Sequence, residues 1–174
     1  LILKKELKEQ ILEDGGHEER SAAYHLKIQT KLTELAIAMQ LQKIKIPKWY
    51  ENQIKKMHSW SIKIRLLNGK HPTFNDSSPD SSPKIDSVLS FTKGFIDKKL
   101  PPKPRDLSDK DWLLNYYLLK SCNFNITNKR INLSKESNLI DLPKTGWIMI
   151  NHANEIELIF KNGIPCPKHL PAHV

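Results

Sequence analysis

Residues 14–25 read DGGHEERSAAYH, and the rest of the chain is best understood outward from this stretch. Gly15 and Gly16 predict a turn, because glycine adopts backbone angles that are closed to other residues. Ser21 is a good N-cap, so a helix is expected to begin directly after it. Tyr24 then falls in the first turn of that helix. A turn that leads into a helix and carries Tyr, His, Glu and Arg side chains can hold an active site.

Apolar residues recur at helical spacing on both sides of this turn. Leu3, Leu7 and Ile11 lie four residues apart and predict an amphipathic helix that the glycines end. A second helix is expected over residues 22–42 and a third over residues 47–67, since proline fits the first position of a helix. Amphipathic helices joined by short connections predict stacked helical hairpins. The apolar positions of the second and third helices are Leu26, Ile28, Leu32, Leu35, Ala36, Met39, Trp49, Ile54, Met57, Trp60 and Ile64.

The middle of the chain alternates between loop and helix. Residues 68–83 are rich in Asn, Asp, Ser, Pro and Gly and predict a long loop, of the kind that is usually functional or mobile. A short helix is expected over residues 86–97, followed by a proline-rich spacer at residues 98–105. Another helix is expected over residues 111–120, with Ser108 or Asp109 as its cap and with Trp112, Tyr116 and Tyr117 packed in the core.

The end of the chain has the composition of strands. Residues 146–153 and 155–161 are rich in β-forming residues and predict an antiparallel hairpin. In the second run the apolar residues alternate with polar ones, as in a strand with one buried face, formed by Ile156, Leu158 and Phe160. Helices followed by an antiparallel hairpin give an α+β fold class.

The charge of the chain indicates which partners are plausible. A net charge of +9 and a pI near 9.5 favour a polyanion such as nucleic acid, an acidic polysaccharide or a membrane surface. A lysine-rich solvated surface is the alternative explanation. Nucleic acid has weak support, because no zinc-finger, RRM or basic-zipper pattern is present, and no apolar run is long enough for a membrane span. Cys122 and Cys166 lack the CxxC spacing of a metal site.

Three motifs in this chain resemble those of the heparinase II/III family of polysaccharide lyases. The first is residues 14–25, where the family typically reads DGGHFERSPxYH; this chain departs from it at Glu18 and Ala22. The second is residues 67–77, LNGKHPTFNDS, which is similar to the DGxxPxFNDS element. The third is residues 170–173, LPAH, which is similar to the start of a PAHxHxD run. The motifs occur in the family's order.

The resemblance implies a larger architecture. Residues 1–97 would be the last helical hairpins of an (α/α)-toroid, residues 98–120 a linker and helix, and residues 121–174 the first strands of an antiparallel β-sandwich. The chain begins within a helix and ends within a motif, so we expect it to be a piece of a longer protein. Members of the family are often periplasmic or associated with the cell envelope.

The reaction that the resemblance implies is β-elimination on a uronic-acid polysaccharide, such as a glycosaminoglycan or alginate. A base removes the C5 proton and an acid protonates the departing O4 oxygen. Tyr24 matches the family's catalytic tyrosine, and His173 matches a histidine beside the substrate carboxylate. A tyrosine suits the acid role because it is neutral below its ordinary pKa of about 10.

Further residues around these motifs are candidate contacts to the substrate, namely Glu19, Arg20, His25, Asn75 and Asp76. Arg20 precedes Tyr24 by four residues, a spacing that would place both on one helix face. Each candidate has a structural alternative: Glu19 suits a helix N-terminus, His25 is more often structural than catalytic, and Asn75 and Asp76 suit a turn. No metal or cofactor is expected in this piece, although the full-length family fold can carry a structural zinc. A non-catalytic basic module that binds anionic glycan is the alternative function.

Overall fold

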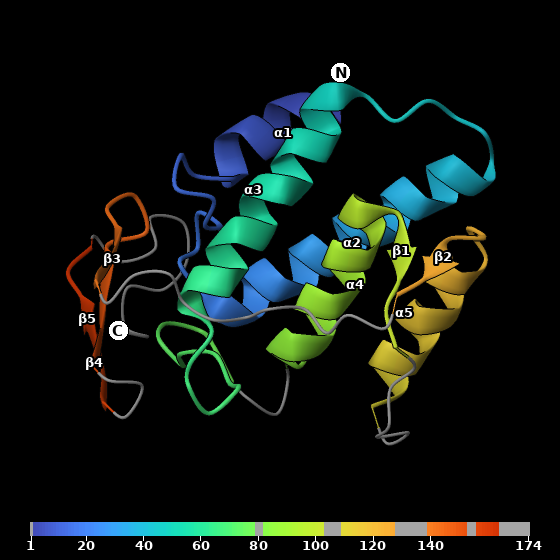
Figure 1. Cartoon of the computed structure of the whole chain (residues 1–174). Coiled ribbons are helices and arrows are strands. Elements are labelled where there is room, and N and C mark those ends of the chain that lie inside the picture. The colour runs from blue at the N-terminus through green and yellow to red at the C-terminus, as the bar shows by residue number, and fades with distance from the viewer. Residues whose placement is uncertain (1, 79–81, 103–108, 128–138, 153–155, 164–174) are drawn as a thin grey trace.

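The computed structural model describes residues 2–78, 82–102, 109–127, 139–152 and 156–163. Its helices are α1 (Ile2–Gln10), α2 (Ala22–Leu41), α3 (Lys48–Ile64), α4 (Ile85–Asp97) and α5 (Lys110–Lys120). Its strands are β1 (Lys99–Leu100), β2 (Asn125–Ile126), β3 (Leu139–Leu142), β4 (Trp147–His152) and β5 (Ile156–Lys161). Figure 1 shows the helices packed together in one group, with strands β3 to β5 at one end of the molecule and α5 at the other. The mixture of helices with an antiparallel sheet confirms the α+β class.

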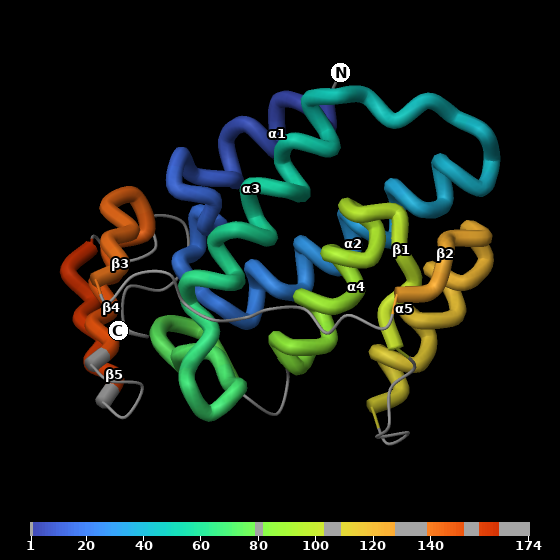
Figure 2. The backbone as a smooth tube through the Cα atoms, in the orientation of Figure 1, coloured from blue at the N-terminus to red at the C-terminus, as the bar shows by residue number. Residues whose placement is uncertain are grey.

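The buried side chains form two clusters, one among helices α1 to α5 and one where α2, α3 and α4 meet strands β3 and β4, and α2 contributes to both. Helix α2 contacts α3, α4 and α5, and Figure 2 shows it passing behind α4. Ile37, Ile54 and Phe91 are fully buried where α2, α3 and α4 meet. Burial of side chains of this size is worth about 1.5–3 kcal/mol each. Among the described residues, no helix is long and apolar enough to cross a membrane.

The expected caps are present, but two expected core positions lie at the surface. Ser21 caps α2 by accepting a hydrogen bond from the Tyr24 N–H, and Asp109 caps α5 in the same way. Leu35 is 44% exposed, so its placement in the buried stripe of α2 was wrong. Helix α2 is covered from several sides, and its buried arc runs through Ile37 instead. Tyr117 is also exposed, whereas Trp112 and Tyr116 of the same helix are buried as expected.

Strands β3, β4 and β5 form an antiparallel sheet in that order. The hairpin of β4 and β5 confirms the prediction, but its buried face was assigned wrongly. Leu158 and Phe160 are 49% and 51% exposed, while Ile159 packs on the core. Met149 of β4 pairs with Ile159, so the side-chain period of two puts these two residues on the inner face. Strand β3 was missed, and the proline-rich spacer contains β1, which pairs with β2 in parallel.

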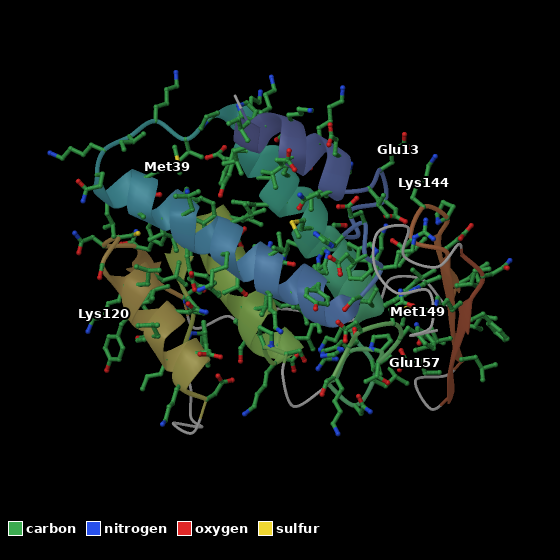
Figure 3. All side chains as sticks on the ribbon, turned by 180° about the vertical axis from the view of Figure 1, so that it is seen from behind. Glu13, Met39, Lys120, Lys144, Met149 and Glu157 are labelled. Atoms are coloured by element: carbon green, nitrogen blue, oxygen red, sulfur yellow. The ribbon has the colours of Figure 1, made fainter. Side chains whose placement is uncertain are left out.

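A carboxylate joins the turn before α2 to the sheet. Asp14 Oδ2 accepts a hydrogen bond from the Thr145 N–H at 2.6 Å, and Asp14 Oδ1 accepts one from Thr145 Oγ1 at 3.0 Å. Asp14 Oδ1 also accepts from the Gly16 N–H. The Trp60 indole N–H donates to Thr145 Oγ1, so the hydroxyl is both donor and acceptor. This network, which we call the Asp14 clamp, fixes the turn between β3 and β4 against α3. Figure 3 shows Glu13 and Lys144, an exposed ion pair, beside it.

The two glycines of the turn are required by close contacts. A Cβ on Gly16 would lie 2.3 Å from Thr145 Oγ1 and 2.8 Å from Trp60 Nε1. Gly15 has a φ of +99°, and a Cβ there would lie 2.5 Å from the Lys56 carbonyl oxygen. Side chains at these positions would push the turn away from α3, so the pair of glycines allows the Asp14 clamp to close.

A polar network is buried between α2, α3 and α4. His25 Nε2 lies within 3.2 Å of Gln29 Oε1 and the Met57 carbonyl oxygen, and 3.1 Å from Ser61 Oγ. Gln29 Nε2 donates to Thr92 Oγ1 at 3.0 Å. Burial lowers the pKa of His25 to about 3, so the ring is neutral in the folded protein.

The first prediction tests the Asp14 clamp. Thr145→Val keeps the shape of the side chain but removes the oxygen that Trp60 and Asp14 share. We expect it to lower the free energy of unfolding by about 1–3 kcal/mol, because buried polar groups are left unpaired. Lys144→Ala is the matched control in the same turn, and loss of its exposed ion pair should change stability by less than about 1 kcal/mol. Urea unfolding of both variants measures the difference, and equal effects would contradict the clamp.

The second prediction concerns acid stability. Burial lowers the pKa of His58 to about 4, and neither ring nitrogen has a hydrogen-bond partner among the described residues. The unfolded chain binds protons at both His25 and His58 below about pH 6.5, whereas the folded chain does not until about pH 3 and 4. The stability that these two neutral histidines contribute is therefore fully present above about pH 6.5 and is lost as the pH falls toward their folded-state pKa values.

His58→Leu isolates one of these two contributions. It removes no hydrogen bond and should leave stability at pH 7 within about 1.5 kcal/mol of the original, as for other volume-conserving changes. Below pH 6.5 we expect its unfolding free energy to fall less steeply with pH, because its unfolding takes up about one proton fewer per molecule. Urea titrations between pH 4 and 7 measure the slopes. An unchanged slope would show that His58 is not held neutral.

Candidate active site

Tyr24 lies where α2 begins, at the position that the sequence predicted. Its hydroxyl donates a hydrogen bond to Asp76 Oδ2 at 2.8 Å, and this contact is exposed. The Lys27 ammonium lies 5.5 Å from the centre of the Tyr24 ring. The ring is therefore held at the surface between an anion and a cation, with its hydroxyl able to reach a ligand.

The loop that contains Asp76 is anchored on the start of α2. Ser21 Oγ donates to the Asp76 carbonyl oxygen at 3.0 Å and lies 2.9 Å from Ser77 Oγ. Ser77 Oγ in turn accepts a hydrogen bond from the Ala23 N–H. The serine that caps the helix thus also holds the loop, which places the Asp76 carboxylate over Tyr24.

Asn75 ties the same loop to the residues before the cap. Its Nδ2 donates to the carbonyl oxygens of Glu19, at 3.2 Å, and Arg20, at 3.0 Å. Its Oδ1 accepts a hydrogen bond from Lys161 Nζ, which comes from β5. The sequence therefore identified a group of residues that the structure brings together: Glu19, Arg20, Tyr24, Asn75 and Asp76.

Arg20 belongs to this group for a different reason from the one expected. It precedes the Ser21 cap and has a φ of 53°, so it lies outside α2 and the helical-spacing argument was wrong. Non-glycine residues with positive φ are uncommon. The Arg20 carbonyl is held by Asn75 and its N–H donates to the His17 carbonyl oxygen, and these contacts fix the strained backbone.

Two neighbouring charges alter the proton affinities at the site. The hydrogen bond and negative charge of Asp76 raise the pKa of Tyr24 above its ordinary value, since both favour the neutral phenol. Burial and the positive charge of Arg20 lower the pKa of Lys161. Tyr24 therefore keeps its proton at neutral pH, and Lys161 lies within the electrostatic field of Arg20.

His25 must be removed from the candidate substrate contacts. Its side chain is fully buried in the polar network under α2, with its ring centre 4.2 Å from that of Trp60, so it has no surface for a polysaccharide. Helical rotation explains the difference, because Tyr24 and His25 are adjacent and point about 100° apart. His173, the second predicted catalytic residue, lies outside the described residues.

Two cavities lie near this site. One of about 320 Å³ lies between α2, α4 and α5, and Lys27, which also contacts Tyr24, lines it together with Lys31 and Trp112. The other, of about 760 Å³, is lined by Leu66, by residues 68–74 and 82–87, and by Ile159. In the described part of the chain no group of three or more His, Cys, Asp or Glu side chains is arranged to hold a metal ion.

Sequence reasoning missed two residues that build the site. Ser77 is the last residue of the FNDS element, and its position beside Asn75 and Asp76 was a clue to its role. Lys161 carried no clue, because it is one of many lysines and reaches Asn75 across 86 residues of sequence.

Comparison with known proteins agrees with the motifs around Tyr24 and Asp76. No curated protein and no solved structure matches the chain. A family model described as "Heparinase II/III N-terminus" matches residues 1–100, which include the turn, helices α1 to α4 and the anchored loop. That match covers more than half of the 174 residues. The chain therefore belongs to the heparinase II/III family.

Proposed function

We propose that this chain carries part of the active site of a polysaccharide lyase, with Tyr24 as the proton donor. The observation that supports the proposal best is the exposed hydroxyl of Tyr24, held at 2.8 Å by Asp76 at the start of α2. A neutral phenol in a fixed position is suited to protonate a departing oxygen. The substrate class that fits the family is an acidic polysaccharide that contains uronic acid.

The reaction is a β-elimination. A general base takes the C5 proton of the uronic acid, the electron pair forms the C4=C5 double bond, and the bond between C4 and O4 breaks. Tyr24 then gives its proton to O4, which leaves as the hydroxyl of the shortened chain. Acid catalysis of this kind contributes about 100- to 10,000-fold in rate.

Asp76 strengthens the hold of Tyr24 on its proton. Its carboxylate keeps the phenol neutral, which favours the acid role. For Tyr24 to act as the base as well, it would first have to lose its proton, to Asp76 or to solvent, and its raised pKa opposes that loss. His173 remains a predicted catalytic residue through the family resemblance.

The third prediction tests Tyr24 directly. In the full-length protein, Tyr24→Phe should reduce turnover of a uronan by at least about 100-fold, because the proton transfer is lost. Phe keeps the ring and its contact with Lys27, so stability should change by less than about 1 kcal/mol. Turnover is followed by the ultraviolet absorbance of the new double bond, on heparan, alginate and bacterial uronans.

Tyr117→Phe is the matched control for this experiment. Tyr117 is an exposed tyrosine on α5, and loss of its hydroxyl should leave turnover unchanged. Near-normal turnover of Tyr24→Phe would remove Tyr24 from the mechanism. Absence of any unsaturated product from the unaltered protein on all of these uronans would overturn the lyase proposal itself.

The fourth prediction uses the pH profile. Asp76→Asn keeps an oxygen that accepts from Tyr24 but removes the negative charge, so the pKa of Tyr24 should fall toward its ordinary value of about 10. Because an acid catalyst is active only when protonated, the alkaline loss of kcat should begin at a lower pH in the variant. A profile that stays in place, or moves to higher pH, would show that Tyr24 is not the acid.

Binding without catalysis is the second candidate function. The raised pKa of Tyr24 favours it, since a phenol that holds its proton firmly gives it up less readily to a leaving oxygen and is not available as the base. A basic module would bind anionic glycan equally well after Tyr24→Phe, and its affinity would fall steeply with salt. Measured binding with no unsaturated product from the unaltered protein would support this function in place of the first.

A further inference from the structure

A serine and a histidine outside the Tyr24 site meet at the wall of the larger cavity. His71 Nε2 lies 2.5 Å from Ser82 Oγ, and His71 Nδ1 lies 2.9 Å from the Pro72 carbonyl oxygen. Both side chains line the cavity of about 760 Å³. The proposed elimination gives neither of them a role, so the pair needs a separate explanation.

The backbone fixes which nitrogen of His71 carries the proton. A carbonyl oxygen can only accept a hydrogen bond, so the contact with Pro72 requires the proton on Nδ1. In the neutral ring this leaves a lone pair on Nε2, which accepts the hydrogen bond of the Ser82 hydroxyl. The imidazole is therefore oriented to take the proton of Ser82, as a general base does for a serine nucleophile.

The exposure of the two side chains suits these roles. His71 is buried, with 7% of its surface exposed, whereas Ser82 is half-buried and borders the cavity. A buried ring keeps its orientation because its neighbours hold it. A hydroxyl on the cavity wall can reach a bound molecule.

Contacts between distant segments hold the cavity in shape. The Leu67 N–H donates to Glu157 Oε2 of β5 at 3.0 Å, and the Phe74 ring meets Trp147 edge-on with ring centres 5.5 Å apart. The volume lies within the range of small-molecule sites, about 300–1,000 Å³. The apolar part of its lining consists of Leu66, Pro72, Phe74, Pro83, Ile85 and Ile159.

We propose that Ser82 and His71 form a nucleophile–base pair that hydrolyses an ester of a small apolar carboxylic acid bound in this cavity. The apolar walls fit the acyl group of such an ester. Lys70 lines the same cavity, and an ammonium group stabilises the negative charge that develops on the carbonyl oxygen during acyl transfer. The proposal concerns a second site and does not rest on the lyase activity.

The reaction proceeds through an acyl-enzyme. Ser82 Oγ forms a bond to the carbonyl carbon of the ester while its proton passes to His71 Nε2. The bond between that carbon and the alcohol oxygen breaks, and His71 gives the proton to the departing oxygen. Water then attacks the acyl-serine with His71 again as the base, which releases the carboxylic acid and restores the Ser82 hydroxyl.

The test labels the unaltered full-length protein with a fluorophosphonate, a reagent that phosphonylates activated serines. We expect the label on Ser82, located by mass spectrometry of the peptides, and we expect none in urea, because the pair exists only in the folded chain. Ser87 is an internal control, since it lines the same cavity but its hydroxyl donates to Asp109 Oδ2 at 2.7 Å. It should remain unlabelled.

Hydrolysis of p-nitrophenyl acetate is the second readout. Ser82→Ala and His71→Gln should each lower the protein-dependent rate by at least about 100-fold, because the nucleophile or its base is lost. Ser121→Ala removes an exposed hydroxyl at the end of α5 and should leave the rate unchanged. Thermal unfolding shows whether each variant is folded.

Three results would overturn the proposal: no label on Ser82 of the unaltered protein, equal label on Ser82 and Ser87, or ester hydrolysis that survives Ser82→Ala. Each would leave Ser82 as the hydrogen-bond partner of a structural histidine. The labelling of the unaltered protein decides the question even where His71→Gln fails to fold. Neither readout involves uronan cleavage, so this proposal and the lyase proposal fail independently.

Discussion

The Asp14 clamp is the constraint on which the rest of the structure depends. One carboxylate binds the Thr145 N–H, the Thr145 hydroxyl and the Gly16 N–H, and Trp60 donates to the same hydroxyl. Gly16 has no room for a side chain, so helix α3, the turn before α2 and the sheet meet with nothing between them. The clamp joins the turn that precedes α2 to the turn between β3 and β4, and β5 pairs with β4. The clamp therefore determines which side chains can meet around Tyr24.

A second set of contacts brings the residues of the candidate site together around the start of α2. Ser21 caps α2 and at the same time holds the loop at Asp76 and Ser77, while Asn75 binds the strained segment before the cap. Each of these side chains has two tasks, one for local structure and one for the site. Changes at Ser21 or Asn75 are for this reason poor tests of chemistry, whereas Tyr24 can lose its hydroxyl while keeping most of its packing.

Local patterns predicted much of this arrangement, and the remainder depended on contacts between distant segments. Helical periodicity and the caps at Ser21 and Asp109 gave the helices, because those signals lie within one turn. The buried face of β5 was assigned wrongly, since alternation shows two faces without showing which one meets Trp147 and Met149. The Asp14 clamp joins two residues that lie 131 positions apart in the sequence, and no sequence pattern near Thr145 predicts it.

The most direct measurement of the central claim is a crystal structure of full-length Tyr24→Phe with a bound uronate oligosaccharide. The account predicts a glycosidic O4 about 3 Å from the place where the Tyr24 hydroxyl lies, within reach of a general acid. An oligosaccharide bound elsewhere, or one whose O4 lies too far from residue 24 for a hydrogen bond, would contradict the account.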